Sequence, residues 1–434
     1  MGLRTGDLGP MSVVSLFSGC GGLDFGFEAA GWEIPFRNDF DRHSCATLAL
    51  NSGGEVAHGA IEQISTEQIL SAVGRGKNAV DVVIGGPPCQ PFSKSAYWSR
   101  GDTHRLKDAR ANTLDEYFRV VEDLTPRAFL LENVQGINYS GKEEGFQFLI
   151  ERIREINRKK GTDYRPSWRV MNAADFGVPQ LRVRFFLVAI RDGKEFRFPE
   201  PTHTNADTGN ATLFDIHRAP YSTAWDALRN VQPDNNEKLT VGGKWGALLP
   251  SIPEGENYLW HTDRKGGCPL FGWRTRYWCF LLKLAKSRPS WTIQAQPGSA
   301  VGPFHWENRK LSWREMAAIQ TFPRSFKIDS PRVEIQRQIG NAVPSLLAET
   351  LARALKEQIC SVQFDEPRKL AIAKARFTPE PEQPTNVPKE FMHLVGVHDA
   401  HPGTGKGRSY QNRPNRVASG INSPRSHTTG HTGP

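Results

Sequence analysis

The sequence has few cysteines and no long apolar run. Its six cysteines include no C-x₂-C pair, and its twelve histidines suggest no ligand cluster, so we expect neither a zinc site nor a disulfide framework. No segment approaches the roughly 20 apolar residues of a membrane-spanning helix. Residues 1–10 also lack the apolar run of a secretory signal peptide. We therefore expect a cytoplasmic, intracellular protein without a metal or a membrane partner.

Acidic residues are outnumbered by basic ones, 46 to 55, which leaves a formal net charge of +9. A basic chain suits a polyanionic partner such as nucleic acid, although many basic proteins bind none. At 434 residues the chain exceeds one typical domain, so two domains and a tail are the natural expectation.

One cysteine stands in a turn that is built for reactivity. Residues 85–93 read Gly-Gly-Pro-Pro-Cys-Gln-Pro-Phe-Ser and follow the apolar strand 82–84. The prolines restrict the backbone, and a strand end near helix N-termini and basic side chains lowers a thiol pKa from its usual value of about 8.5. An inert, buried cysteine is the alternative for Cys89. We prefer a nucleophile, because other segments supply the rest of a reaction.

The first of these segments is glycine-rich. Residues 13–24 read as an apolar strand, a turn with three glycines and the start of a helix, which together suit a nucleotide-like ligand. Asp24 stands where the dinucleotide fingerprint has its third glycine, so that motif is excluded. Asp39, about twenty residues after the glycines, can hold ribose hydroxyls, and Phe40 can stack on an adenine. A simple tight turn is the alternative interpretation.

Two further strands end in charged residues. Glu132 closes the apolar strand 128–131, where open α/β sheets bind ligands, and it is a candidate acid beside Cys89. Arg182 and Arg184 begin the strand 185–190 and can hold a phosphate or a carbonyl oxygen. A helix cap or a salt bridge would explain the glutamate equally well, and solvent-facing positions would explain the arginines.

In this order the segments identify a family. The chain resembles the C5-cytosine-specific DNA methyltransferases of bacterial restriction-modification systems, with matching motifs at residues 17–22, 87–90, 132–134, 180–184, 314–323 and 338–344. The resemblance covers residues 13 to about 358. It implies an α/β fold, a doubly wound Rossmann-like sheet that uses S-adenosylmethionine, with a second, smaller, irregular and β-rich target-recognition domain.

The resemblance also implies a reaction at C5 of a cytosine that is flipped out of duplex DNA. Cys89 would add to C6, Glu132 would hold or protonate N3, and Arg184 would steady O2, so that C5 becomes nucleophilic enough to take a methyl group. Arg182 and Gln90 complete the expected catalytic set.

The cofactor site that the resemblance implies draws on both halves of the catalytic domain. Phe17 and the glycine turn would line the methionine part, Asp39 would hold the ribose, and Phe40 and Ile61 would enclose the adenine. The full expected set is Phe17, Ser18, Gly19, Gly21, Gly22, Leu23, Asp39, Phe40, Ile61, Gly86, Pro88, Asn341 and Val343. The chain departs from the family at Ala60, where the usual aspartate would accept a hydrogen bond worth about 1 kcal/mol.

Changes in pattern predict the domain organisation. Residues 11–190 alternate strands and helices, including helices at 114–124 and 145–158, and form the first part of the catalytic domain. Residues 191–308, with a helical pattern only at 277–286, form the target-recognition domain. Residues 309–360 return to the catalytic domain with two helices, at 311–319 and 338–355, and residues 361–434 form a disordered basic tail.

DNA contacts are expected from two regions. In the recognition domain Arg274 and Arg276 are the leading candidates to read bases, while most of the interleaved aromatic residues build the core. In the basic loop after the cysteine we expect Ser93, Lys94, Ser95 and Arg100 to contact DNA.

Two other functions remain open. A tRNA-methylating branch of the family shares the Pro-Pro-Cys turn, but its Cys-Phe-Thr tripeptide is absent, since Cys279 and Phe280 are followed by Leu281. A catalytically silent DNA-binding regulator is the other alternative, and the retained Cys89 and Glu132 argue against it. The expected partner is double-stranded DNA bound by a monomer, and a cognate restriction endonuclease acting separately is left open.

Overall fold

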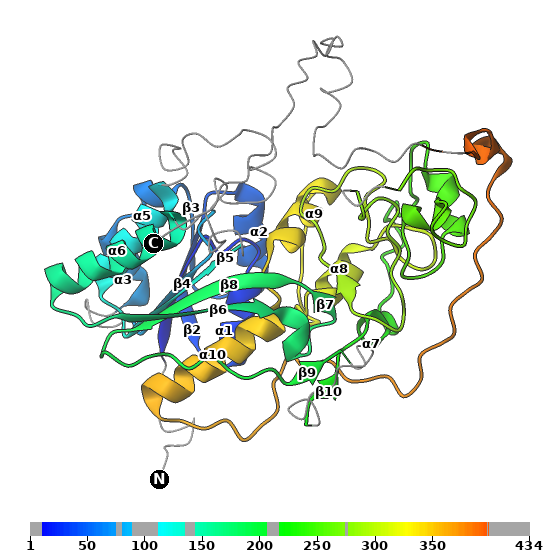
Figure 1. Cartoon of the computed structure of the whole chain (residues 1–434). Helices are drawn as coiled ribbons and strands as arrows, with labels where there is room; N and C mark the ends of the chain where they lie inside the picture. Colours follow the sequence, from blue (N-terminus) through cyan, green and yellow to red (C-terminus); the bar gives the residue numbers. More distant parts are fainter. Residues whose placement is uncertain are drawn as a thin grey trace, which may run out of the picture.

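The structure is a computed structural model that describes residues 11–74, 80–88, 112–134, 144–205, 217–273, 277–396 and 398. A sheet with helices on both faces forms one part, and a smaller, irregular lobe lies beside it (Figure 1). This is the doubly wound α/β class with a second small lobe, so the predicted fold class is confirmed.

The main sheet has seven strands in the order β3-β2-β1-β4-β5-β8-β6. β1 to β5 are parallel, whereas β8 runs antiparallel to both of its neighbours. Strands β1 and β4 are buried throughout because helices cover both faces of the sheet. The strands are β1 (Ser12–Leu16), β2 (Glu33–Asp39), β3 (Glu55–His58), β4 (Val82–Gly85), β5 (Ala128–Asn133), β6 (Arg165–Asn172) and β8 (Val183–Ile190).

Two apolar layers cover the sheet. Helices α1 and α10 pack together on one face, and α3, α5 and α6 cover the other (Figure 1). The helical segments of this first part are α1 (Gly22–Ala29), α2 (Arg42–Asn51), η2 (Ile61–Gln63), α3 (Thr66–Val73), α5 (Asn112–Leu124), α6 (Glu144–Lys160) and η6 (Ala173–Phe176).

The register of the strands sets the position of the site. Leu16 is the partner of both Asn38 on β2 and Gly85 on β4, and Gly85 is the partner of Leu131 on β5. The residues that follow these partners therefore emerge together at the carboxyl edge of the sheet, at the point where the strand order reverses between β1 and β4.

Three helices follow the second lobe, where the sequence predicts two: α8 (Trp313–Ile319), α9 (Arg332–Asn341) and α10 (Ser345–Cys360). The prediction of one helix over 338–355 was wrong. Pro344 lacks an N–H and disfavours helical geometry at the residue before it, so α9 ends and α10 begins on either side of it.

The second lobe is irregular. Its short segments are β9 (His203–Thr204), β10 (Ala219–Pro220), α7 (Ala224–Leu228), η9 (Gly246–Ser251), η10 (Tyr258–His261) and β11 (Ser290–Trp291), and β11 pairs with β7 (Gln180–Leu181) of the first part. We call the apolar cluster formed by Val241, Leu248, Leu249, Ile252, Tyr258, Leu259, Leu270, Leu281, Phe304 and Phe391 the second-lobe core.

The predicted helical pattern at 277–286 was wrong. This segment consists of turns and isolated bridges, in which Phe280 pairs with Val301 and Lys283 pairs with Phe304. Leu281 adopts a left-handed φ of 52°, which ends any helical run, and its side chain enters the second-lobe core. Tertiary packing has therefore overridden the local periodicity.

Residues 361–396 are ordered, although the sequence predicts a disordered tail from residue 361. They leave α10, run along the lower side of the molecule and end on the second lobe at η11 (Lys389–Leu394) (Figure 1). Residues 397 and 399–434 lie outside the described residues. Over the part of the chain that is described, no helix has the length and apolarity that crossing a membrane requires.

Candidate active site

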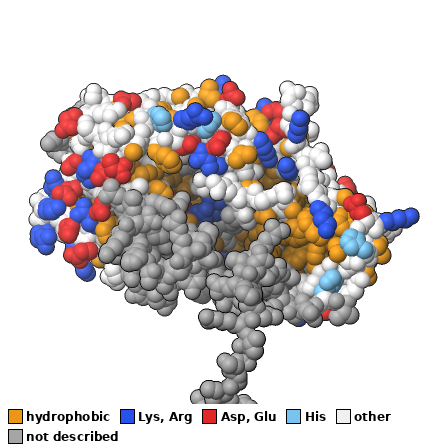
Figure 2. Space-filling model, turned by 90° about the horizontal axis from the view of Figure 1, so that it is seen from above, with side chains coloured by type: hydrophobic (Ala, Val, Ile, Leu, Met, Phe, Trp, Pro, Cys, Tyr) orange, Lys and Arg blue, Asp and Glu red, His pale blue; other side chains and the backbone are white. Residues whose placement is uncertain are grey.

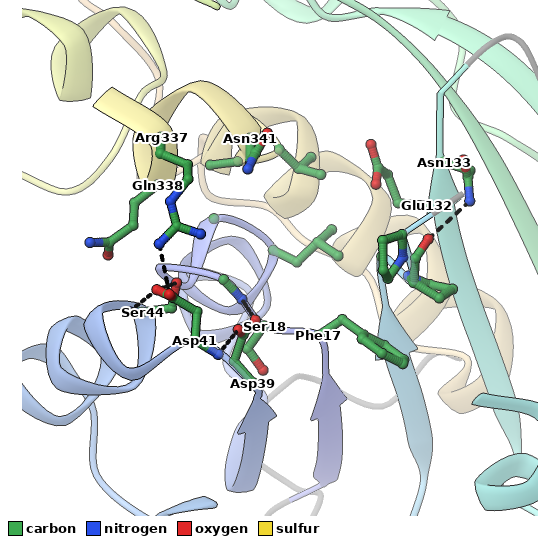
Figure 3. A pocket seen from close by; sticks show the side chains of 18 of the residues that line it. Phe17, Ser18, Asp39, Asp41, Ser44, Glu132, Asn133, Arg337, Gln338 and Asn341 are labelled. Atoms are coloured by element: carbon green, nitrogen blue, oxygen red, sulfur yellow. Dashed lines mark hydrogen bonds and ion pairs between the residues drawn. The ribbon is translucent and has the colours of Figure 1, made fainter. Parts of the chain in front are cut away.

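A cavity of about 320 Å³ opens at the carboxyl edge of the sheet (Figure 3). It is lined by the ends of β1, β2, β4 and β5 and by residues that reach it from α9 and from the turn after it. The lining residues are Phe17, Ser18, Gly19, Gly22, Leu23, Asp39, Phe40, Asp41, Ser44, Gly86, Pro87, Pro88, Glu132, Asn133, Val134, Arg184, Arg337, Gln338, Asn341, Ala342 and Val343.

The turn that leads to the predicted nucleophile lies against β5. The Asn133 side-chain amide donates a hydrogen bond of 3.2 Å to the Pro87 carbonyl, and Asn133 is buried. A methyl group on Gly86 would come 2.9 Å from the Glu132 carboxylate, so a larger residue here would require that carboxylate to shift. Pro88 lines the cavity. Cys89 and Gln90 lie outside the described residues.

Glu132 and Arg184 form an ion pair at the wall of this cavity. The Arg184 Nε lies 3.0 Å from the Glu132 Oε1, and both side chains are largely buried. Burial raises the pKa of Glu132 above its ordinary value, and the charges of Arg184 and Arg182 oppose this only in part. A raised pKa makes a carboxyl group a better proton donor at a given pH than an exposed carboxyl group, which is a property of a general acid.

Arg182, predicted to be catalytic, does not line the cavity. It is fully buried, and its guanidinium donates to the carbonyl of Gly340 at 2.8 Å and to that of Ile293 at 3.4 Å. Arg182, which lies between β7 and β8, therefore links these strands to the end of α9 and to the segment after β11. Its charge nevertheless acts on Glu132 and lowers the pKa of that carboxyl group.

The side of the cavity opposite Glu132 is polar. It is formed by Gly19, Asp39 and Asp41, which we call the polar cradle. The Asp39 carboxylate accepts hydrogen bonds from the backbone N–H groups of Gly19 at 2.8 Å and Asp41 at 2.9 Å, which fixes its orientation. Burial raises the pKa of Asp39, while these two N–H groups favour its charged form. Phe17 turns out of β1 with a left-handed φ of 52°, and the Phe40 ring is 65 % exposed.

Helix α1 and the turn between α9 and α10 close the cavity from above. A methyl group on Gly22 would come 2.4 Å from the Val343 carbonyl, so glycine is needed for the two segments to touch. The side-chain amide of Gln320, a residue of the α8 motif, donates to the Ile339 carbonyl and accepts from Gln180 at 2.9 Å. Motif residues far apart in the sequence thus hold Asn341 and Val343 at the cavity.

Two predicted cofactor residues do not line the cavity. Gly21 is the N-cap of α1 with φ 89°, and it allows the sharp turn into the helix. Ile61 is 2 % exposed and packs in the apolar layer on the α5 side of the sheet. Asp24, which replaces a fingerprint glycine, is buried and accepts hydrogen bonds from Ser15 and Arg37.

Sequence reasoning missed a polar group on the rim. Arg337 of α9 reaches across to Asp41 at 2.7 Å, and Asp41 accepts from the Ser44 N–H at 2.9 Å (Figure 3). The pKa of Asp41 is lowered, chiefly by its hydrogen bond with Arg337 against the effect of burial. A sequence signal existed for Arg337 alone, which directly precedes the motif at 338–344.

The residues predicted to contact DNA, Ser93, Lys94, Ser95, Arg100, Arg274 and Arg276, lie outside the described residues. Seen from above, the molecule is hollowed between its two parts, and hydrophobic side chains line the wall on the second-lobe side (Figure 2). Tyr277, Trp278 and Trp291 of that lobe are exposed, whereas Tyr258 and Trp306 are buried. Among the described residues no group of His, Cys, Asp and Glu could hold a metal ion.

Comparison with known proteins shows which family the chain belongs to. Residues 11–357 match the family model of the C-5 cytosine-specific DNA methylases. The Type II methyltransferase M.SacI of Streptomyces achromogenes is 41 % identical over 372 residues, covering 80 % of this chain and 93 % of that protein. The Type II methyltransferase M.NgoFVII of Neisseria gonorrhoeae is 35 % identical over 350 residues, covering 79 % and 86 %.

The fold is also found among solved structures. A mutant of Spodoptera frugiperda DNMT2 superposes with a TM-score of 0.54 at 16 % identity, covering 80 % of this chain and 99 % of that one. With a matching family model over most of its length, this chain belongs to the C-5 cytosine-specific DNA methylases and is a DNA (cytosine-5-)-methyltransferase.

Proposed function

We propose that the chain transfers a methyl group to C5 of a cytosine that is flipped out of a specific duplex DNA sequence, through a covalent bond between Cys89 and C6. The observation that carries the proposal is the Glu132–Arg184 pair, which shares one cavity with the Asp39 cradle and the turn that leads to Cys89. The acid and the cradle therefore face a common space in which two ligands can meet.

The residues of the cradle fit S-adenosylmethionine. The N-terminus of α1 presents backbone N–H groups suited to a carboxylate, Asp39 suits ribose hydroxyls, and the exposed Phe40 ring offers a face to an adenine. Close approach of Gly22 to Val343 keeps this end of the cavity narrow. When bound, the cofactor supplies the methyl group.

The chain's own groups make the cytosine reactive. The Cys89 thiolate adds to C6, and the electron pair displaced from the C5–C6 bond makes C5 nucleophilic while negative charge moves toward N3 and O2. Glu132 gives its proton to N3, and Arg184 lies beside it to hold O2. C5 then takes the methyl group, and S-adenosylhomocysteine is left behind. A base removes the C5 proton, the C5–C6 double bond re-forms as Cys89 leaves as a thiolate, and N3 returns its proton to Glu132.

The target atoms are inaccessible inside stacked duplex, so the base must be extruded at a cost on the order of a few kcal/mol. We assign sequence recognition to residues 191–308 and assembly of the site to residues 11–190 and 309–360. Both relatives described above are named Type II methyltransferases, and a cognate restriction endonuclease that acts separately is accordingly part of the proposal.

A methyl-transfer assay tests the substrate. Tritiated S-adenosylmethionine is offered with duplex DNA or with tRNA, and we expect label in DNA only. Label in tRNA alone would assign the chain to the RNA branch, and label in neither substrate would favour a silent DNA-binding regulator.

The covalent route is tested with duplex that carries 5-fluorocytosine. Fluorine blocks the final elimination, so a denaturation-resistant adduct should form only when S-adenosylmethionine is present. Cys89→Ser should form no adduct and transfer no methyl group while still binding DNA, because a hydroxyl is much less nucleophilic at neutral pH. An active wild-type enzyme that forms no adduct would refute the covalent step.

A further inference from the structure

Residues 361–396, which we call the C-terminal brace, lie beyond the family match that ends at residue 357. Their only regular element is η11, yet hydrogen bonds hold their backbone at three separate places along the chain. An extended segment gains little from its own internal structure, so these external contacts must order it.

The first anchor is helix α10. The Glu349 carboxylate accepts hydrogen bonds from the backbone N–H groups of Lys369 and Leu370 at 2.7 and 2.9 Å. Arg353, paired with Glu349 at 2.8 Å, donates to the carbonyls of Glu366 and Pro367. The start of the brace is thus fixed to the helix that covers the main sheet.

The second anchor is helix α7, which packs against α8. Asp226 accepts a hydrogen bond from the Ala375 N–H at 2.6 Å, and the Trp225 Nε1 donates to the Phe377 carbonyl at 2.9 Å. Phe377 contributes its backbone carbonyl to this anchor, whereas the residue itself is 71 % exposed.

The third anchor is the second-lobe core. Phe391 is 1 % exposed and stacks on Trp245 with ring centroids 5.7 Å apart and an interplanar angle of 15°. The Thr385 N–H donates to the Pro250 carbonyl at 3.0 Å, and the Gly396 N–H donates to the Pro269 carbonyl at 3.2 Å. A side chain from the end of the brace therefore completes a core whose other members come from residues 241–304.

We propose that the C-terminal brace sets the position of the second lobe relative to the active-site cavity, with Phe391 as the positioning residue. The two parts already share an apolar cluster that includes Phe25, Leu284 and Met316, and they are joined by the pairing of β11 with β7. A tether anchored on both parts further limits their relative motion. The inference rests on the proposed function, because the second lobe is assigned there to DNA recognition. A brace that holds this lobe in place lowers the free-energy cost of forming the productive DNA complex. It does not change the rate of the methyl-transfer step.

The test is Phe391→Ala in the full-length chain, with Phe377→Ala as the matched control. Loss of the buried ring should raise the KM for cognate duplex about tenfold, a change equivalent to about 1.4 kcal/mol, while kcat stays within about twofold. The affinity for S-adenosylhomocysteine should not change, and Phe391→Leu should restore most of the DNA KM. The control should match the wild type, because it removes an exposed ring of the same size.

Hydrogen–deuterium exchange separates positioning from general destabilisation. Phe391→Ala should speed exchange in residues 241–273 and leave β1 and β4 unchanged. If Phe391→Ala does not fold, Thr385→Pro removes the donor to Pro250 and should produce the same changes to a smaller degree. An unchanged DNA KM, or equal losses of kcat and cofactor affinity, would overturn the proposal. Absence of methyl transfer by the wild type would refute the proposed function instead, and the exchange data would still test the brace.

Discussion

Glu132 experiences two opposing influences on its pKa. Burial raises it, and the guanidinium groups of Arg184 and Arg182 lower it, with burial the larger effect. The pKa of Arg184 also experiences two opposing influences. Burial lowers it, and the charge of Glu132 raises it. Burial therefore favours the uncharged form of each group. This suits a site that, as we propose, gives a proton to a cytosine and takes it back.

This arrangement predicts a pH dependence. The proton on Glu132 is present below its raised pKa and is lost as pH rises through it, so the contribution of Glu132 to kcat should decline toward alkaline pH. Glu132→Gln cannot deliver a proton, and we expect kcat to fall about 100-fold and this decline to vanish. Single-turnover rates across pH check the prediction, with the exposed Glu200→Gln as control. A wild-type alkaline decline that survives in Glu132→Gln would contradict it.

Arg182 illustrates a residue whose importance is structural. Replacing it with methionine removes the donors to the Gly340 and Ile293 carbonyls inside a buried region. We expect the free energy of unfolding to fall by about 3 kcal/mol, because buried carbonyls lose their partners. Urea denaturation measures the change, and Arg154→Met, at a side chain 70 % exposed, should have almost no effect. Equal stabilities would show that Arg182 is not a structural tie.

At the scale of elements, the site depends on contact between α1 and the turn that joins α9 to α10. A methyl group fits at Gly53, where nothing lies within 4 Å, but not at Gly22, where the Val343 carbonyl would be 2.4 Å away. The backbone carbonyl cannot swing aside as a long side chain could. When Gly22 is replaced, either α1 or the turn after α9 must therefore shift away from the polar cradle.

We accordingly expect Gly22→Ala to weaken the binding of S-adenosylhomocysteine by at least about tenfold, or about 1.4 kcal/mol. Gly53→Ala should bind it as the wild type does. Isothermal titration calorimetry on both variants measures the difference. Unchanged affinity in Gly22→Ala would mean that the turn can yield without disturbing the cradle.

At the scale of the whole molecule, we assign chemistry to the first part and sequence recognition to the second lobe. Every described residue that lines the cavity comes from residues 17–184 or 337–343, and none comes from the second lobe. The second lobe nevertheless joins the first part through the pairing of β11 with β7. If the lobe reads the DNA sequence as proposed, its residues can change without changing the reaction, provided that this junction is preserved.

Exchange of residues 241–285 for the corresponding segment of a relative with another specificity should transfer that specificity. The exchange leaves Ser290 and Trp291 in place, so β11 can still pair with β7. Sequencing of methylated DNA from cells that express the hybrid identifies the site. Methylation of the original sequence by an active hybrid would show that recognition lies elsewhere.

Replacement of Arg274 or Arg276 provides a finer test of the same division. Loss of a bidentate contact should cost about 1–3 kcal/mol of discrimination at one base pair, with part of the turnover on the cognate site retained. Lys94→Ala should instead weaken binding to all sequences alike and flatten its salt dependence, as expected for a phosphate contact. Competition binding at several salt concentrations distinguishes the two behaviours, and uniform losses in both variants would remove the arginines from base reading.

The sequence by itself determined the family, the sheet and most of the cavity, because these depend on local patterns. These patterns are motifs of fixed order and apolar strands whose carboxyl ends lie at or next to Phe17, Asp39, Gly86 and Glu132. Only the tertiary structure decided which charged residues face the cavity. Arg182 and Arg184 lie two residues apart. Arg182 is buried and donates to the Gly340 carbonyl, whereas Arg184 lines the cavity and pairs with Glu132, because different segments pack against the two side chains.

The same reason explains the other differences from the sequence predictions. Ile61 lies in an apolar layer, residues 277–286 follow bridges in place of a helix, and residues 361–396 are ordered by partners that are distant in the sequence. A local pattern records the preference of a segment in isolation. Long-range packing and hydrogen bonds contribute more free energy than that preference, and they become visible only once the chain is folded.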